Sequence, residues 1–299
     1  MKILDNYLQH ICGKKNVKRN EPLSSWTTFR VGGPARYFVV VETKTALCKL
    51  ISALDFLEYP YFILGLGANI LASDDGFDGV VIKLNFTNIE HNDVFVYADA
   101  GAKLGAVVKY ACEHGLSGLE WATGIPATVG GGVYMNCGAF AHSISDVVVM
   151  VDVLEDGEVR TLTRNQLDFG YRHSRFMDKT AVILGVYFRL TKDESSKIKT
   201  RMQEIVQKRC AHPRQPSAGS VFKRPKDGFY VGKVIEDLGL GGYTVGGAQV
   251  STQHCNFIVN LGNATCHDIL QVLYHIQDVV EKATGVLLET EIIFLGNVN

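Results

Sequence analysis

The feature that most constrains this chain is the placement of its glycines. Glycine accounts for 30 of the 299 residues, about 10%, against an average usage of about 7%. Two dense groups lie at residues 65–69 and 124–138, and a third lies at 239–247. Glycine allows turns with positive φ and lets backbone N–H groups come close to a ligand. All three stretches are therefore predicted turns, and the first two are candidate anion-binding loops.

The first group, GLGAN at 65–69, follows the β-rich run YFIL at 61–64. A Rossmann dinucleotide site requires G-x-G-x-x-G at the start of a helix. Here the sixth position is Ile70, and the polar residues 73–76 that follow predict no helix. Both the Rossmann match and the match to a Walker loop are weak, the latter because Gly232-Lys233 lacks the required upstream glycine. The loop is thus interpreted as a turn after a strand whose backbone N–H groups can approach a phosphate.

The second group, at 124–138, mixes five glycines with isoleucine, valine, tyrosine and methionine. Flexible linkers are polar and rich in Gly and Ser, so the apolar residues here predict a loop that packs inside. Its backbone N–H groups then need acceptors, which a bound pyrophosphate would supply. A tight buried turn between core elements is an equally good interpretation. The third group is interpreted as turns between short elements.

Charge and composition exclude several classes of protein. Thirty Lys and Arg against 31 Asp and Glu give a net charge of −1, without the basic excess of proteins that bind nucleic acids or acidic membranes. No apolar run approaches the roughly 20 residues that span a bilayer, and the N-terminus lacks the apolar core of a signal peptide. Seven cysteines without a C-x-x-C pair indicate reduced thiols in the cytoplasm. The nine histidines show no metal-ligand spacing, so no metal is expected.

Strand-like and helix-like segments alternate along the chain. Short β-rich runs predict strands at 37–41, 61–64, 80–84, 94–99, 147–154 and 182–190. Apolar stripes predict one helix at 104–112, ended by Gly115, and another at 269–280, with Asp268 as a cap and Gly285 as a stop. The polar segment 192–209 is a predicted helix and the best domain junction. We therefore expect an α+β protein with a larger domain at 1–200 and a smaller one at 201–299.

Three segments contain candidate catalytic side chains. Ser220 follows a glycine and has two cations nearby, Lys223 and Arg224, so it could donate a proton or bind an anion. Glu291 lies with Glu289 in a predicted closing strand, 287–295, whose alternation places both carboxylates on one face. Arg172 lies in the sequence YRHSR. Each has an ordinary alternative, namely a turn serine, a solvated strand face and a surface arginine.

Six motifs occur in one order from about residue 20 to the C-terminus. They are TTFRVGGPA at 27–35, GLGANIL at 65–71, the loop at 124–138, YRHS at 171–174, AGSVFKRP at 218–225 and LETEIIFLG at 288–296. Each motif is modest alone. Together they closely resemble the bacterial UDP-N-acetylenolpyruvoylglucosamine reductases (MurB).

The resemblance implies the FAD-binding fold of the vanillyl-alcohol oxidase (PCMH) type. The FAD-binding domain would be residues 1–200, in two α+β subdomains split near residue 72. The substrate-binding α+β domain would be 201–299, with its strand 287–296 carrying a catalytic glutamate. The implied reaction uses NADPH and non-covalent FAD to reduce the enolpyruvyl ether of UDP-N-acetylglucosamine to UDP-N-acetylmuramate in peptidoglycan synthesis, with hydride passing from flavin N5 to the alkene. The UDP-sugar and NADPH are the expected partners of a monomer that binds neither nucleic acid nor membrane.

The resemblance also implies roles for single residues. Ser220 is the expected proton donor, Glu291 its acidic partner, and Arg172 the third catalytic residue, which clamps the substrate carboxylate. The residues expected to bind FAD are Arg30, Gly65, Gly67, Ala68, Asn69, Ile70, Gly101, Thr123, Gly124, Ile125, Pro126, Gly130, Gly131 and Asn136. Those expected to bind the substrate are Arg224 and Lys233, at its diphosphate, together with His254 and Asn256.

The chain departs from the family pattern at three places. Ala68 stands where the family commonly has Ser, and Ala127-Thr128 where it has Gly-Ser or Gly-Thr, so one hydroxyl contact to FAD is expected to be lost. The stretch between Arg209 and Ser220 is short and the tyrosine-bearing loop of one branch is missing, which favours the shorter branch. Two alternatives stay open. One is another FAD-dependent oxidase of the same fold, although residues 65–71 contain no histidine for covalent flavin. The other is a nucleotide-sugar binding module without redox turnover.

Overall fold

The computed structural model describes residues 2–178 and 181–298. The chain forms two compact units, each assembled from distant stretches. The first comprises Met1–Lys18, Phe38–Gly65 and Val80–Cys210, and the second Arg19–Tyr37, Leu66–Gly79 and Ala211–Asn299. This grouping differs from a single cut of the chain near residue 200. The stretches Arg19–Tyr37 and Leu66–Gly79 belong to the same unit as the C-terminal stretch.

The elements are as follows. The first unit contains α1 (Lys2–Cys12), α2 (Lys44–Phe56), β3 (Tyr61–Leu64), β6 (Ile89–Asn92), β7 (Phe95–Asp99), α3 (Leu104–Glu113), β8 (Leu116–Ser117), α4 (Val129–Tyr134), β9 (Gly138–Ala139), β10 (His142–Ser143), β11 (Val148–Glu155), β12 (Glu158–Thr163), β13 (Ala181–Arg189), β14 (Thr191–Lys192) and α5 (Ser195–Lys208). The second contains β4 (Ile70–Ala72), α6 (Val231–Asp237), β15 (Thr244–Val245), β16 (Ala248–Val250), β17 (Ile258–Asn260), α7 (Cys266–Thr284) and β18 (Ile293–Leu295). Residues of β1 (Val17–Pro22), β2 (Pro34–Val41) and β5 (Phe77–Leu84) belong to both units.

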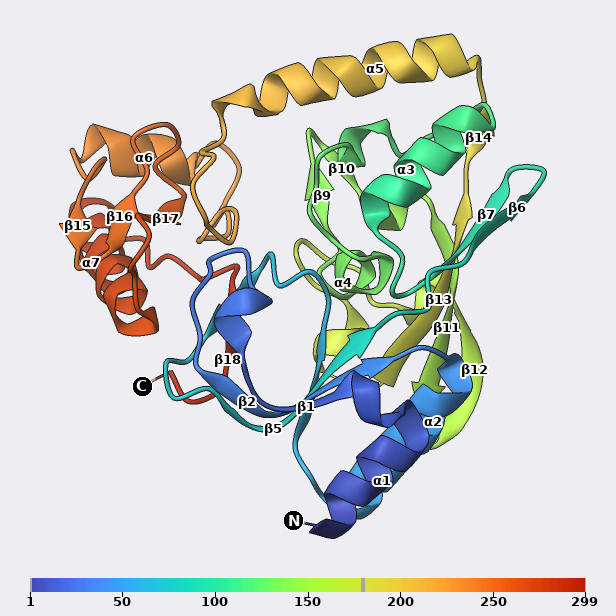
Figure 1. The fold of residues 1–299 in the computed structure, drawn as a ribbon. Helices are drawn as coiled ribbons and strands as arrows, with labels where there is room; N and C mark the ends of the chain where they lie inside the picture. Colours follow the sequence, from blue (N-terminus) through green and yellow to red (C-terminus); the bar gives the residue numbers. More distant parts are fainter. Residues whose placement is uncertain (1, 179–180, 299) are drawn as a thin grey trace. The chain divides into compact units, whose positions relative to one another are not determined.

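The first unit is built around an antiparallel sheet with the strand order β12-β11-β13-β7-β6 (Figure 1). Its central strands are rich in buried valine, which suits a pleated surface covered on one face or both. Gly185 in β13 leaves room for Tyr97 of β7, since a Cβ there would lie 2.0 Å from the tyrosine hydroxyl. Beside this sheet, β3 pairs in parallel with β5, and the register sets Leu64 opposite Lys83.

In the second unit, α7 packs on the small sheet β15-β16-β17 and its start is set by local chemistry. Thr265 is the N-cap residue and accepts a hydrogen bond from the N–H of Asp268. The expectation that Asp268 itself is the cap is therefore wrong, because Asp268 is the third helical residue of a capping box. The carboxylate of Asp74 also accepts the N–H groups of Cys266 and His267. Gly285 ends the helix with a φ of 72°, as predicted.

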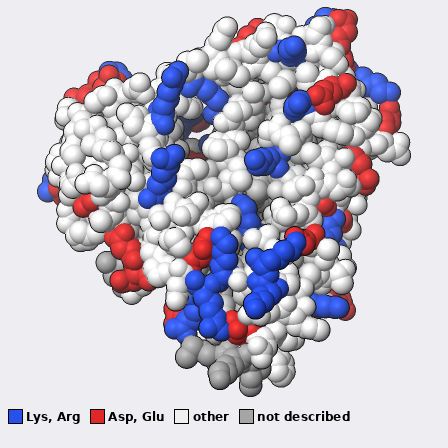
Figure 2. Space-filling model, in the orientation of Figure 1, with Lys and Arg blue, Asp and Glu red and all other residues white. Residues whose placement is uncertain are grey.

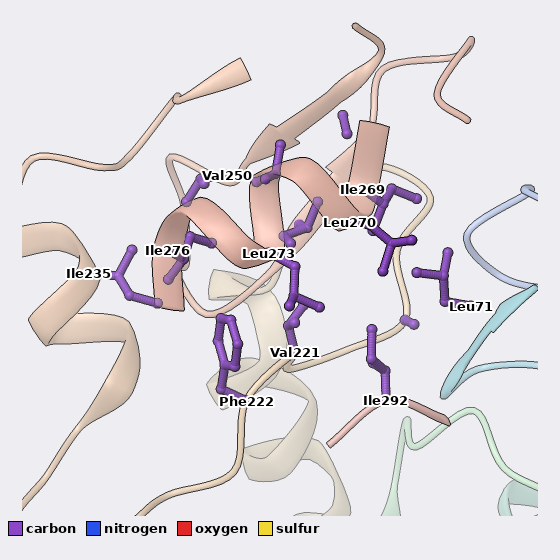
Figure 3. Packing of buried hydrophobic residues seen from close by; sticks show 14 of the residues in the cluster. Leu71, Val221, Phe222, Ile235, Val250, Ile269, Leu270, Leu273, Ile276 and Ile292 are labelled. Atoms are coloured by element: carbon purple, nitrogen blue, oxygen red, sulfur yellow. The ribbon is translucent and has the colours of Figure 1, made fainter. Parts of the chain in front are cut away.

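The apolar face of α7 makes the core of the second unit. Ile269, Leu273 and Ile276 are fully or almost fully buried, and they belong to the same cluster as Val221 and Phe222 (Figure 3). Ile292 and Leu71 complete the same cluster. Full burial of one such side chain stabilises the fold by about 1.5–3 kcal/mol. The core therefore fixes the backbone beside Ser220 and Glu291.

Most predicted elements are confirmed. The six predicted strands lie in β2, β3, β5, β7, β11 and β13, the predicted helices correspond to α3, α5 and α7, and 239–247 forms turns. The predicted closing strand at 287–295 is wrong over 287–292, since β18 begins only at Ile293 and pairs in parallel with β4. Before it, Thr290 forms an isolated antiparallel bridge with Phe222.

Charged side chains are spread over the surface. On the face drawn in Figure 2, Lys and Arg lie in several separate groups with Asp and Glu between them. Along residues 2–178 and 181–298, no helix combines the length and the apolar character needed to cross a membrane.

Candidate active site

Ser220 lies in a loop of the second unit whose backbone is held on both sides. Gly219 before it has a φ of 75°, and Val221 after it is fully buried. The N–H of Val221 donates to the carbonyl of Asn256 at 2.8 Å, and the carbonyl of Val221 accepts the N–H of Glu291 at 2.7 Å. In the described part of the chain, the Ser220 hydroxyl bonds to no protein group. It is therefore available to a ligand.

Asn256 fixes this loop with its side chain. Its Oδ1 accepts the N–H of Phe222 at 3.1 Å, and its Nδ2 donates to the carbonyl of Phe222 at 3.0 Å. The residue is only 8% exposed. The sequence predicts a substrate contact here. The structure commits the amide to Phe222, so Asn256 positions the loop that carries Ser220.

Glu291 is tied to the first glycine loop. Asn69 Nδ2 donates to the carbonyl of Glu291 at 2.9 Å, and the carbonyl of Asn69 accepts the N–H of Ile293 at 2.9 Å. The second unit thus brings together Ser220, Glu291 and the end of the GLGAN loop, which lie far apart in the sequence. Nearby, Lys223 forms a salt bridge with Glu289, so its charge is already partly matched.

The other residues expected to bind substrate differ in their charge state. On α6, Lys233 bonds Asp237 at 2.6 Å, and this hydrogen bond raises the pKa of the lysine. Burial lowers the pKa of His254, which keeps it neutral at pH 7. Arg224 is exposed, with its guanidinium 5.4 Å from the centre of the Tyr230 ring. Arg224 is therefore the strongest of these candidates for a diphosphate.

The first glycine loop has the form of an anion cradle. Gly67 has a φ of 65°, and a Cβ on it would lie 2.2 Å from the carbonyl oxygen of Trp26, so only glycine fits. Among the residues described, the N–H groups of Gly67, Ala68 and Asn69 donate to no protein acceptor. Consecutive free N–H groups in a turn bind phosphate. Arg30, an exposed residue of the same unit, also has a positive φ of 57°.

In the second glycine loop, more N–H groups bond protein acceptors than the sequence suggests, because the loop includes the short helix α4. The N–H groups of Val129, Gly130 and Gly131 bond the carbonyls of Ala102 and Ala100 and the Oγ1 of Thr128, at 2.8, 2.9 and 3.2 Å. The expectation that the N–H groups of this loop lack protein acceptors is wrong for these residues. A tight buried turn describes them better.

The remaining residues expected to bind FAD in the first unit lie on closely packed or exposed backbone. A Cβ on Gly65 would lie 2.9 Å from the Thr128 hydroxyl, so the two glycine loops meet there. A Cβ on Gly101 would lie 2.5 Å from the carbonyl oxygen of Phe86. The hydroxyl of Thr123 bonds the carbonyl of Glu120, and Gly124 and Pro126 are exposed. Ile70 lies buried in β4 of the second unit.

Arg172 sits at a tight turn in the first unit with a φ of 53°, rare for a side chain of this size. Its Nη2 donates to the carbonyl of Gly138 at 2.9 Å. Asn136, which is 5% exposed, donates from Nδ2 to the carbonyl of Gly170 at 2.7 Å. Its Oδ1 accepts the N–H of Ser145. Arg172 is thereby fixed to the end of the second glycine loop.

The side chains of Asn136 and Asn256 both hold neighbouring backbone through hydrogen bonds, which was not predicted from the sequence. The available signal was an amide side chain between apolar residues, which is most often satisfied by nearby backbone when it is buried. The acceptor, however, depends on segments that lie about 34 residues away in both cases.

Comparisons with known proteins agree with this arrangement. Residues 212–295 match the family model "UDP-N-acetylenolpyruvoylglucosamine reductase, C-terminal domain", and residues 35–163 match "FAD binding domain". Reductases of that name from Pediococcus pentosaceus and Caldanaerobacter subterraneus are 40% and 41% identical over 298 residues, covering 98% of this chain and 99% and 98% of theirs. The crystal structure of the MurB enzyme of Thermus caldophilus aligns with a TM-score of 0.82 at 36% identity, covering 93% of this chain and 98% of that one. The chain belongs to the UDP-N-acetylenolpyruvoylglucosamine reductase (MurB) family.

Proposed function

We propose that this chain is an FAD-dependent oxidoreductase that uses NADPH to reduce UDP-N-acetylglucosamine enolpyruvate to UDP-N-acetylmuramate for peptidoglycan synthesis. Family membership over nearly the whole chain supports the reaction. The observation that carries the residue roles is the hydrogen bond from the Glu291 N–H to the Val221 carbonyl. It holds a serine hydroxyl and a carboxylate on adjoining backbone, with the GLGAN loop joined to the same segment.

The residues fit the cofactor. The free N–H groups at 67–69 suit the FAD diphosphate, and the absence of a Cβ at Gly67 lets the loop fold against Trp26. When bound, FAD supplies the hydride that it receives from NADPH. The protein must then manage a negative charge on the substrate and deliver one proton.

Arg172 is proposed to bind the substrate carboxylate, because a guanidinium matches a carboxylate with two parallel hydrogen bonds. Hydride addition to the terminal alkene carbon leaves negative charge that spreads into this carboxylate, and Arg172 stabilises it. Ser220 donates its hydroxyl proton to the adjacent carbon. Glu291 orients the enol form through a shared proton. The unbonded state of the Ser220 hydroxyl supports this assignment.

Several finer points stay predictions. Arg224 is the proposed contact to the substrate diphosphate, ahead of Lys233 and His254. A cytoplasmic location, a monomeric state, membership of the shorter branch and the assignment of FAD and substrate to separate domains rest on the sequence.

An anaerobic spectroscopic titration tests the function. Flavin absorbance of the purified chain is expected to bleach on addition of NADPH and to return on addition of the enolpyruvyl substrate, with UDP-N-acetylmuramate as the product. Bleaching without recovery by this substrate would contradict the reductase activity. A chain that cannot be loaded with FAD would also exclude the alternative oxidase.

A further inference from the structure

A half-buried lysine, Lys83, lies at the point where the two glycine loops meet. Lys83 lies in β5 directly opposite Leu64, and its Nζ donates to the carbonyl of Gly65, the first residue of the GLGAN loop. Gly65 in turn approaches the hydroxyl of Thr128, at the start of α4. Lys103, the N-cap residue of α3, pairs with Thr128 through a backbone bridge. All of these residues belong to the first unit.

Within the described residues, the two lysines place positive charge here without a carboxylate paired to either of them. Burial and, to a smaller extent, the nearby charge of Lys103 together lower the pKa of Lys83 to about 8. In the described part of the chain, neither lysine forms a salt bridge with Asp or Glu. Lys44 of the same unit, by contrast, bonds Asp99 at 2.7 Å. A desolvated ammonium that faces another cation is unstable unless an anion joins it.

We propose that Lys83 is a cofactor-binding residue that neutralises the FAD diphosphate at Gly65, and that FAD binding is coupled to protonation of its amine. The proposal rests on the FAD dependence of the enzyme but not on its substrate. The family resemblance assigns Gly65 to FAD but assigns nothing to Lys83. The signal in the sequence is a single charge in the apolar strand VVIKL at 80–84.

The sign of the coupling follows from the two states of Lys83. Without FAD, the amine is partly neutral near pH 8, because burial and Lys103 disfavour its charge. An adjacent dianion favours the ammonium, so FAD binding takes up a proton. Affinity for FAD therefore falls as the pH rises above about 8, by up to tenfold per pH unit. Of the charged groups in the described residues, Lys103 acts on the pKa of Lys83, and Leu64, opposite Lys83 on the neighbouring strand β3, is apolar.

Equilibrium titration of the full chain, freed of FAD, tests this coupling between pH 7 and pH 9. Lys83→Gln is expected to weaken FAD binding at least tenfold at pH 7 and to remove the pH dependence. Lys83→Arg keeps its charge throughout, so it should bind FAD with an affinity that does not change between pH 8 and pH 9. Lys109→Gln, an exposed lysine of α3 paired with Glu113, is the matched control and should behave like the parent.

Calorimetry in two buffers of different ionisation enthalpy provides the second readout. The parent should take up a substantial fraction of one proton per FAD at pH 8.5, and both Lys83 variants should take up none. Unaltered FAD affinity in Lys83→Gln, or proton uptake that persists in Lys83→Arg, would overturn the proposal. Thermal unfolding of the FAD-free variants separates a folding defect from lost binding. If Lys83→Gln does not fold, Lys83→Arg alone decides the result. If FAD binding and proton uptake behave as expected but the enzyme does not reduce the enolpyruvyl substrate, only the proposed function is contradicted.

Discussion

Both polar atoms of the Asn256 side chain bond the backbone of one residue, Phe222. Phe222 is 2% exposed, so its N–H and carbonyl are buried groups that lose these partners when the amide is removed. A single buried side chain therefore decides whether the loop that carries Ser220 keeps its shape.

Asn256→Ala should lower the free energy of unfolding by about 2 kcal/mol or more, because it leaves two buried backbone groups without partners. Urea unfolding measures this loss. Asn263→Ala, at an exposed position, is the control and should change stability by less than about 0.5 kcal/mol. Equal effects of the two substitutions would show that the amide of Asn256 does not hold the loop.

The Glu120 carboxylate is predicted to make stability depend on acidic pH. Burial alone would raise its pKa, but hydrogen bonds from backbone N–H groups, the Ser117 hydroxyl and Arg201 outweigh burial and hold the pKa below its usual value. A lowered pKa in the folded state means that this stabilisation is present above the unfolded value, near 4.5, and is lost as the pH falls through the folded value.

Glu120→Gln should therefore be less stable than the parent at pH 7, and the difference should shrink as the pH falls toward 3.5. Melting temperatures across this range measure it. Glu158→Gln removes an exposed carboxylate paired with Arg160 and serves as the control. A constant difference between Glu120→Gln and the parent at every pH would contradict the assignment.

Gly67→Ala tests the first glycine loop. Alanine at a φ of 65° is strained, and its Cβ would meet the Trp26 carbonyl, so the loop must move. Affinity for FAD should fall at least tenfold, as measured by flavin titration. Gly228→Ala, at a φ of 77° in open space, carries the backbone strain without the contact. Gly228→Ala should bind FAD with the affinity of the parent. If it loses as much affinity as Gly67→Ala, backbone strain and not the contact with Trp26 explains the loss.

Local signals in the sequence predicted much of the fold. The strand at 61–64 and the stop at Gly285 were predictable, since β-rich composition and a left-handed glycine act within a few residues. The extent of the closing strand was not predictable, because residues 287–292 have strand-like composition while the backbone groups of Glu289 and Glu291 bond those of Lys223 and Val221. Pairing with a segment so distant in sequence leaves no local pattern.

The candidate site divides in the same way. The turn chemistry of GLGAN was visible, since it depends on glycine at fixed spacing. The hydrogen bonding of the second loop was not visible, because its N–H groups bond the carbonyls of Ala100 and Ala102, which come from a separate segment. The neutral state of His254 and the engagement of Asn256 likewise depend on burial that only tertiary packing creates. The proposed roles of Ser220, Glu291 and Arg172 rest on motif order rather than on local chemistry.

The half-reactions of Ser220→Ala test the central assignment most directly. Rapid mixing with NADPH should bleach the flavin at nearly the parent rate, because no proton from Ser220 is needed in that step. Recovery of flavin absorbance on mixing with the enolpyruvyl substrate should slow by about 10²- to 10⁴-fold. Ser217→Ala, in the same loop, should leave both rates unchanged, since only its backbone carbonyl is used, by the Thr28 hydroxyl. Equal slowing of both half-reactions in Ser220→Ala, or recovery at the parent rate, would contradict the account.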